Sequence, residues 1–182
     1  MKRSGQHAGV LGRRLRGRPL AASAASVIAF AGGAVATAAS ASGGAPNFSV
    51  TTIDGKTFTL AAQRGKVVVL DFLAGGSCAV CAKEARVLDR SAAQFASKGV
   101  RVLVVDMSQG STSALRSFYQ GKVGVSKRLL VAPDKGSQVA QSYRVVAVGT
   151  TYIVGRDGSV RWHGLWLGKE NELLGAIAQA AA

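Results

Sequence analysis

Residues 67–81 read VVVLDFLAGGSCAVC, an apolar run of strand length followed by a glycine-containing segment and two cysteines. A run that is apolar apart from Asp71, rather than alternating, is typical of a central strand buried on both faces. Cys78 and Cys81 are the only cysteines of the chain, and a helical pattern begins directly after Cys78. A strand that delivers a C-x-x-C pair onto the start of a helix predicts a dithiol that opens and closes as a disulfide.

The residues after the first cysteine have the periodicity of an amphipathic helix, which we expect to run from Ala79 to Ser97 and to end at Gly99. The expected stripe of this helix consists of Val80, Glu84, Val87, Leu88, Ser91 and Phe95. The next apolar run, residues 102–105, reads as a second buried strand. Together the two strands and the helix predict a parallel β-α-β unit.

The rest of the chain continues to alternate strands with helices. In chain order we expect a hairpin at 48–60 with its turn at Asp54-Gly55, a helix at 111–119, a strand at 129–131, a helix at 135–143, a hairpin at 150–163 with its turn at 155–158, and a last helix that buries Leu173 and Ile177. The pattern predicts an α/β fold: a central mixed sheet flanked by helices, with an N-terminal β-hairpin.

Residues 1–41 differ in composition from the rest of the chain. They contain no acid and six basic residues, which are Lys2, Arg3, Arg13, Arg14, Arg16 and Arg18. An apolar run rich in Ala, Ser and Gly extends from Leu20 to Ala39, and the small-x-small site Ala39-Ser40-Ala41 follows. This order is typical of a secretory signal peptide, and the alternative is an uncleaved membrane anchor. We therefore expect a signal peptide or membrane anchor at 1–41 and one domain at 42–182.

The chain is basic, with a formal net charge of +14. After the six basic residues of the leader are set aside, 17 of the 23 Lys and Arg remain, against 9 Asp and Glu. They are scattered from Lys56 to Lys169, with no basic helix and no interleaving of aromatic and basic residues. This distribution favours a solvated cationic surface over nucleic-acid binding, and it also suits acidic partners or the anionic face of a membrane.

The position of the cysteines predicts the order of attack. A helix N-terminus carries a partial positive charge, which lowers the pKa of a thiol placed there. Cys78 is therefore expected to attack a substrate disulfide, and Cys81, one turn into the helix, to resolve the mixed disulfide. A structural disulfide and half of a zinc site are the alternatives. A structural disulfide between Cys78 and Cys81 would close a loop too short to stabilise the folded state much. A zinc site would have only His7 and His163 as further histidine ligands.

Two acids are candidates for proton transfer with the dithiol. Glu84 follows Cys81 by three residues and so shares its face of the helix. Asp71 interrupts the buried strand, where a carboxyl can serve as a proton acceptor. Each acid also has a purely structural interpretation. Glu84 could lie at the rim of the apolar stripe of its helix, and Asp71 could face solvent at a strand end. Trp162, Trp166 and Tyr152 are expected to pack, and His163 to lie on a surface strand.

The chain resembles the TlpA/ResA-like branch of the thioredoxin superfamily, which consists of exported thiol-disulfide oxidoreductases. The resemblance extends from Ala45 to about Ile177. It rests on Pro46-Asn47-Phe48, Asp54-Gly55-Lys56, the run 65–72, Cys78 and Cys81 with Glu84, residues 102–106, Tyr143-Arg144-Val145, the run 150–154 and Asp157-Gly158. It implies a thioredoxin-like domain at 42–182, with Cys78 and Cys81 as the redox-active disulfide and Glu84 as a tuning acid.

Three departures from this family concern the dithiol. Ser77 stands where the family has Trp, and the segment 74–77 is one residue longer than usual. The family's cis-proline corresponds to Gly149, and none of the three prolines of the chain lies there. A cis bond that does not precede proline costs about 3 kcal/mol, so we expect a trans bond at Gly149. By this resemblance Ser77, Val148, Gly149 and Thr150 are the residues expected to bind substrate.

These observations predict an exported or membrane-tethered thiol-disulfide oxidoreductase that reduces or exchanges disulfides of envelope proteins. We expect it to be extracytoplasmic and monomeric, without cofactor or metal, with a membrane thiol reductase as partner and membrane association through its N-terminus. Two alternatives stay open. A peroxiredoxin-type peroxidase would have Thr or Ser at the position of Gly75, and a Sco-like copper protein would have C-x-x-x-C and a His before a late strand.

Overall fold

The computed structural model describes residues 44–182, so the predicted leader at 1–41 lies outside the described residues. The strands are β1 (Ser49–Thr51), β2 (Thr57–Thr59), β3 (Val67–Leu73), β4 (Val100–Asp106), β5 (Leu129–Pro133), β6 (Thr150–Val154) and β7 (Val160–Leu165). The helices are α1 (Ala79–Gln94), α2 (Thr112–Arg116), α3 (Gln138–Ser142) and α4 (Glu170–Ala180). Helical segments of 3-10 type are η1 (Leu60–Gln63), η2 (Ala96–Lys98) and η4 (Lys135–Ser137), and η3 (Ser117–Val123) is of π type.

A five-stranded mixed sheet in the order β5-β4-β3-β6-β7 forms the centre of the domain. β3 pairs parallel to β4, and β4 pairs parallel to β5. β6 runs antiparallel to both of its neighbours, β3 and β7, so β7 has the same direction as β3. β1 and β2 form a separate antiparallel hairpin. The predicted α/β architecture, with a mixed sheet and an N-terminal hairpin, is therefore confirmed.

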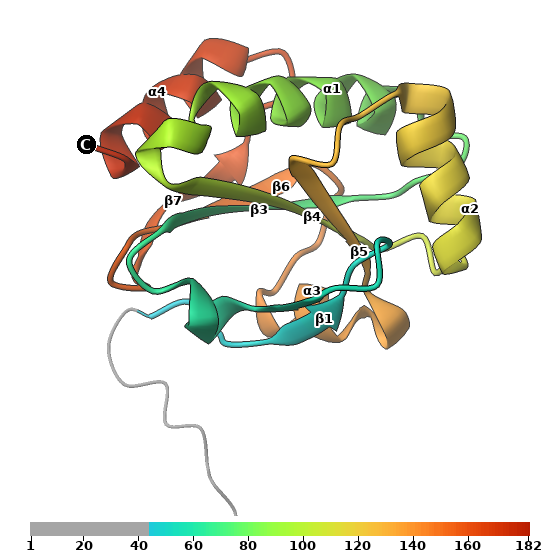
Figure 1. Ribbon diagram of the computed structural model, residues 1–182, viewed down its shortest axis with the longest axis horizontal. Coiled ribbons are helices and arrows are strands. Elements are labelled where there is room, and N and C mark those ends of the chain that lie inside the picture. The colour runs from blue at the N-terminus through green and yellow to red at the C-terminus, as the bar shows by residue number, and fades with distance from the viewer. Residues whose placement is uncertain (1–43) are drawn as a thin grey trace, which may run out of the picture. The chain divides into compact units, whose positions relative to one another are not determined.

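β3 is the middle strand of the sheet, and all seven of its residues are buried. Successive side chains of a strand point to opposite faces. Val67, Val69 and Leu73 accordingly pack in one core cluster with α1, η3 and α4, while Val68, Leu70 and Phe72 pack in another with η1 and α3. Figure 1 shows these layers, with α1 and α4 over one face of the sheet and β1 and α3 over the other.

α1 begins at Ala79, directly after its N-cap Cys78, and ends earlier than predicted, at Gln94. η2 then leads to Gly99 in the left-handed conformation. Its buried face also differs from the predicted stripe. Val80 is 41% exposed, while Cys81 is completely buried and opens the face that continues through Glu84, Ala85, Leu88, Ser91 and Ala92. The prediction was wrong at Val80 because the buried face is centred on Cys81, Ala85 and Leu88, and Val80 lies at the margin of that face. Among the helices of residues 44–182, none is long and apolar enough to cross a membrane.

Candidate active site

The two cysteines form a disulfide at the N-terminus of α1, with a Cα–Cα distance of 5.2 Å. Cys78 is the N-cap residue, and its sulfur accepts a hydrogen bond of 3.1 Å from the backbone N–H of Cys81. Cys78 is half-buried, whereas Cys81 is completely buried. The sulfur of Cys78 therefore lies at the positive end of the helix within reach of a substrate, and that of Cys81 lies behind it. The order of attack stays a prediction, which this placement supports.

The loop that leads from β3 to Cys78 is fastened to Asp106, the last residue of β4. The buried carboxylate of Asp106 accepts hydrogen bonds of 2.6 Å from the N–H of Gly75 and 2.6 Å from the hydroxyl of Tyr119. A Cβ at Gly75 would lie 3.0 Å from Asp106 Oδ2 and 3.1 Å from Leu115, so the approach depends on glycine. Burial and the adjacent Asp106 raise the pKa of Tyr119, which keeps its hydroxyl a donor. Sequence reasoning missed this role of Asp106, because a strand-end Asp gives no signal of what it binds.

Asp71 lies on the same face of β3 as Val69 and Leu73, which is the face that α1 covers. Its carboxylate is completely buried and accepts hydrogen bonds on Oδ2 from the hydroxyl of Thr151 and from Nε1 of Trp166. Oδ1 has no partner. Burial raises the pKa of Asp71 from 3.8 to about 6, against the opposing effect of the two hydrogen bonds. The structure thus excludes the solvent-facing interpretation of Asp71, and it gives Trp166 a polar contact besides packing.

Glu84 is 2% exposed, although it carries a carboxyl group. Its Oε2 atom has no hydrogen-bond partner within residues 44–182. Burial, and secondarily the negative charge of Asp71, raises the pKa of Glu84 from 4.5 to about 7. The rim interpretation of Glu84 is therefore excluded. Glu84 and Asp71 form a pair of buried acids on the side of the sheet that α1 covers, and Glu84 is the member whose pKa lies at neutral pH.

Gly149 lies directly against Glu84. It has a φ of 81°, its N–H donates a 2.8 Å hydrogen bond to the carbonyl of Phe72, and a Cβ built on it would lie 2.8 Å from Glu84 Oε1. The missing side chain leaves the space that the buried carboxyl uses. The sequence pointed to Gly149 as a departure from the family, but the contact with Glu84 appears only in the fold.

The other residues expected to bind substrate surround these groups. Ser77 is exposed in front of Cys78, Val148 is 44% exposed, and the half-buried Thr150 donates its hydroxyl to the carbonyl of Ala147 at 2.7 Å. A cavity of about 370 Å³ opens beside Glu84 and is lined by Lys83, Glu84, Val87, Trp166, Leu167, Gly168 and Glu170. Leu167 is 58% exposed. The surroundings of the dithiol thus offer apolar surface to a partner, and the binding roles stay predictions.

His163 lies away from the cysteines. Its ring stacks on that of Tyr152 with centroids 5.3 Å apart, and Tyr152 packs in the core cluster on the opposite face of the sheet from Cys81. In residues 44–182 no group of three or more His, Cys, Asp or Glu side chains could hold a metal ion. A ligand set made of both cysteines and His163 is therefore incompatible with this fold.

The family model described as the AhpC/TSA family matches residues 42–163, more than half of the chain. A thiol-disulfide oxidoreductase ResA of Bacillus thuringiensis subsp. konkukian is 31% identical over 116 residues, which are 64% of this chain and 64% of that protein. The ResA of Bacillus subtilis is also 31% identical over 116 residues, 64% of this chain and 62% of that protein. The alignments thus span slightly less than two thirds of these relatives.

Solved structures match more of the domain. A protein of Chlorobium tepidum assigned as a thiol:disulfide interchange protein DsbE has a TM-score of 0.67 and 25% identity, covering 77% of this chain and 96% of that one. A protein of Neisseria meningitidis assigned as a thioredoxin has a TM-score of 0.66 and 25% identity, covering 77% and 91%. The predicted thioredoxin-like fold is confirmed by these structures.

The contact between Gly149 and Glu84 predicts the effect of Gly149→Ala. A Cβ at a positive φ costs about 1–2 kcal/mol, and here it would also displace the Glu84 carboxyl. We expect Gly149→Ala to lower the free energy of unfolding of the oxidised protein by at least about 1 kcal/mol more than Gly124→Ala. Gly124 is the matched control, since its φ is 78° and nothing lies within 4 Å of its Cβ.

Urea denaturation measures both variants, and the same comparison in an E84A background separates the two causes. The excess cost of Gly149→Ala should shrink when the carboxyl is absent, which is a coupling between neighbouring residues. Equal losses for both glycine variants in the Glu84 background would contradict the close approach.

The raised pKa of Glu84 predicts a pH-dependent stability. Because the folded state holds this proton more tightly than the unfolded chain, folding takes up a proton between pH 4.5 and about 7. The contribution of Glu84 is therefore largest below pH 4.5 and falls as the pH rises to about 7. We expect the free energy of unfolding of the wild type, measured against E84Q, to fall by about 1–3 kcal/mol over this range. Parallel pH curves for the two proteins would refute the buried, ionisable state of Glu84.

Proposed function

The chain belongs to the AhpC/TSA family, and from this membership and the geometry of its dithiol we propose that it is a thiol-disulfide oxidoreductase that reduces protein disulfides. The predicted place among ResA/TlpA-like proteins of the thioredoxin superfamily is confirmed by the relatives and structural neighbours. The observation that carries the proposal is the Cys78–Cys81 disulfide at the N-terminus of α1, with two buried carboxyls behind it.

The proposed reaction starts from the reduced dithiol. The Cys78 thiolate attacks one sulfur of a substrate disulfide, and the other substrate sulfur leaves as a thiolate. The Cys81 thiolate then attacks the Cys78 sulfur of the mixed disulfide, so that the second substrate sulfur leaves and the Cys78–Cys81 disulfide forms. The two protons of the protein thiols pass to the two substrate thiols, and two electrons move with them.

The buried acids suit the second step of this reaction. Cys81 is completely buried, so its thiol loses a proton with difficulty unless an acceptor lies nearby. Glu84 is one helical turn further along α1 on the same face, and its pKa of about 7 suits a group that accepts and returns a proton at neutral pH. Asp71 raises that pKa through its charge, so we assign it the role of a positioning residue for Glu84.

The proposal also covers the compartment in which the protein acts and its partners. The predicted leader at 1–41 supports an extracytoplasmic protein, and dithiol chemistry on protein disulfides suits an oxidising compartment. There the substrates would be disulfide-bearing envelope proteins, and a membrane thiol reductase would restore the dithiol. The exposed apolar side chains near the dithiol, among them Val80, Val148 and Leu167, suit a polypeptide substrate.

The two alternatives find no comparable support. A peroxidase of the peroxiredoxin type needs a hydroxyl side chain at the position of Gly75, but a Cβ there would press on Asp106 and Leu115. A Sco-like copper site needs a His near both cysteines, whereas His163 lies against Tyr152 on the other face of the sheet. Thiol-disulfide exchange with a polypeptide is thus the function that this site supports best.

Substitution of each cysteine separates the two steps. We expect Cys78→Ser to reduce the rate of reduction of a model aromatic disulfide to the uncatalysed background, because no other thiol is exposed at the helix N-terminus. We expect Cys81→Ser to accumulate a covalent adduct through Cys78, since the resolving thiol is absent. Absorbance assays measure the rate, and mass spectrometry of the intact protein measures the adduct. An active Cys78→Ser variant, or an adduct formed through Cys81 instead, would contradict the order of attack.

The reduction potential tests the direction of electron flow. Buried carboxylates near the sulfurs disfavour the thiolates of the reduced form, which makes the couple more reducing. We expect a potential nearer to about −270 mV, as in thioredoxin, than to about −120 mV, as in a strong oxidant. Equilibration with glutathione or dithiothreitol redox buffers measures it, and E84Q should shift it toward more oxidising values. A wild-type value near about −120 mV would make the protein an oxidase and overturn the reductase direction.

A further inference from the structure

The surface of the domain is more basic than its formal charge indicates. Four of the 9 acids of the chain are buried, namely Asp71, Glu84, Asp106 and Asp134. Every Lys and Arg of residues 44–182 is at least partly exposed. The exposed Lys and Arg side chains are therefore balanced by only five acidic side chains that are at least partly exposed. Three of these five form ion pairs with Arg90, Arg161 and Lys169.

Seven cations gather at one end of the domain, which we term the basic end: Arg64, Lys66, Lys98, Arg101, Arg128, Arg156 and Arg161. Lys66, Arg101 and Arg128 line one cavity of about 210 Å³ where β3, β4 and β5 begin. Arg156 and Arg161 line a second cavity of about 560 Å³.

Contacts of Arg156 and Arg64 connect the cations that line the two cavities. Arg156 donates hydrogen bonds of 3.0 Å to the carbonyl of Gly65 and 3.1 Å to that of Lys98. The guanidinium of Arg64 lies against Gly158. Asp157 is an acidic side chain at this end, and it pairs with Arg161 at 2.9 Å. The basic end is thus one contiguous surface with a strong excess of positive charge.

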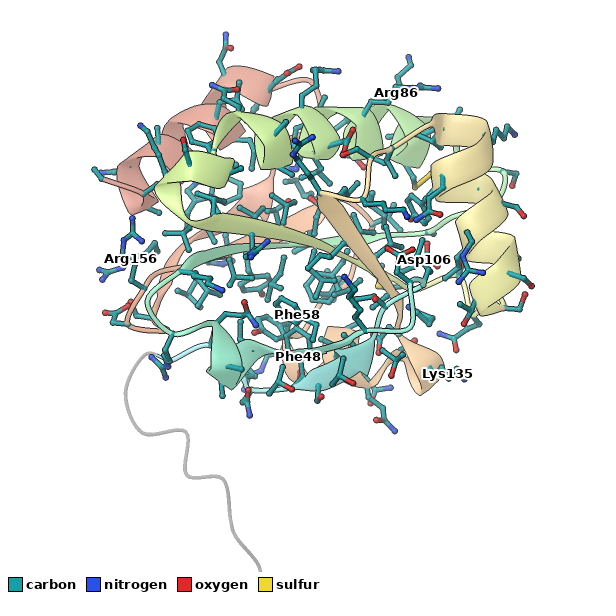
Figure 2. The ribbon with its side chains drawn as sticks, viewed as in Figure 1. Phe48, Phe58, Arg86, Asp106, Lys135 and Arg156 are labelled. Atoms are coloured by element: carbon teal, nitrogen blue, oxygen red, sulfur yellow. A yellow bond between two sulfur atoms is a disulfide. The ribbon has the colours of Figure 1, made fainter. Side chains whose placement is uncertain are left out.

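The basic end lies opposite the dithiol. It includes the residues that precede β3 and begin β4, whereas Cys78 follows the C-terminal end of β3, about 20 Å away along a seven-residue strand. Figure 2 shows Arg156 at one end of the domain and Asp106, which holds the loop before Cys78, at the other. A surface that binds the basic end therefore leaves the dithiol free.

A tryptophan, Trp162, also lies at the basic end. Trp162 is half-buried and lines the larger cavity together with Arg156, Arg161 and Gln179. The indole ring combines an apolar body with one N–H donor, and Trp is enriched where proteins meet the headgroup region of a bilayer. Cations beside an amphipathic ring suit a phospholipid surface better than a purely polar ligand.

The first described residues, Gly44 and Ala45, contact the domain at the basic end. Gly44 forms a β-bridge with Ser159, and the N–H of Ala45 donates a 2.9 Å hydrogen bond to the carbonyl of Gly158. Gly158 is the residue against which Arg64 packs. The sequence predicts a signal peptide or a membrane anchor at 1–41, and in the anchored alternative the chain would enter the domain at the basic end.

We propose that the basic end is a docking surface for an anionic phospholipid membrane, and that in the docked state the dithiol faces away from the bilayer and toward its substrates. Exchange with a membrane thiol reductase, the partner proposed above, takes place when the domain is released from this surface. The attraction of each cation to anionic lipid acts within about one Debye length of the surface, so a cluster on one end orients the whole domain. The proposal is independent of the redox activity, because none of its residues contacts the dithiol.

The test compares two matched triple variants of the full chain. K98Q/R101Q/R128Q removes three cations of the basic end, and K56Q/K122Q/K135Q removes three exposed lysines elsewhere. Co-sedimentation is measured with vesicles of phosphatidylcholine alone and with added phosphatidylglycerol. We expect the first variant to lose about tenfold or more of its binding to anionic vesicles at moderate salt, and the second to stay within about threefold of the wild type.

A second readout reports the orientation. Trp162 and Trp166 are the two tryptophans of the chain, and Trp166 is buried. Brominated lipids in anionic vesicles should quench Trp162, and Trp162→Phe should remove the quenching. Equal losses in both triple variants, binding that does not depend on phosphatidylglycerol, an absence of quenching, or stronger binding to duplex DNA than to vesicles at the same salt would each overturn the proposal. Circular dichroism verifies that every variant is folded.

Discussion

Burial of β3 on both faces is the constraint on which the rest of the domain depends. Because its side chains alternate, one set packs under α1 and α4, and the other packs over η1 and α3. Asp71 belongs to the first set and so lies under the helix that carries Cys81. The pairing of β3 with β4 brings Asp106 to the end of the sheet, where it holds the loop before Cys78. One strand thus places the dithiol, its support and one of its acids.

The second acid depends on a glycine far away in the sequence. Glu84 would not fit in its buried position if the residue at 149 carried a side chain, because the missing Cβ leaves the space beside Oε1. In the family that the chain resembles, a proline stands there and shapes the substrate-facing loop. Here the loop is anchored by the hydrogen bond from Gly149 to Phe72, and the carboxyl lies against its main chain. The departure from the family therefore changes the surroundings of the acid and leaves the dithiol in place.

The fold was largely predictable, and the site only in part. Continuous apolarity at 67–73, turn signals at Asp54-Gly55 and at 155–158, and helical periodicity after Cys78 are local patterns that correspond directly to elements of the structure. The predicted stripe of α1 was wrong at Val80, because the periodicity of apolar residues indicates a face only approximately and does not fix the centre of the face that becomes buried. For Asp71 and Glu84 the sequence left exposure and burial equally open, since that choice depends on what packs against them.

The sequence by itself determined the dithiol, its position at the start of a helix after a buried strand, and the α/β class, because these follow from residue type and short-range spacing. The tertiary structure decided the partners: Thr151 and Trp166 on Asp71, Gly149 against Glu84, Tyr119 and Gly75 on Asp106, and the gathering of seven scattered cations at one end. These contacts join residues that lie far apart along the chain. The pairing and layering of strands and helices bring them together, and no local pattern encodes that proximity.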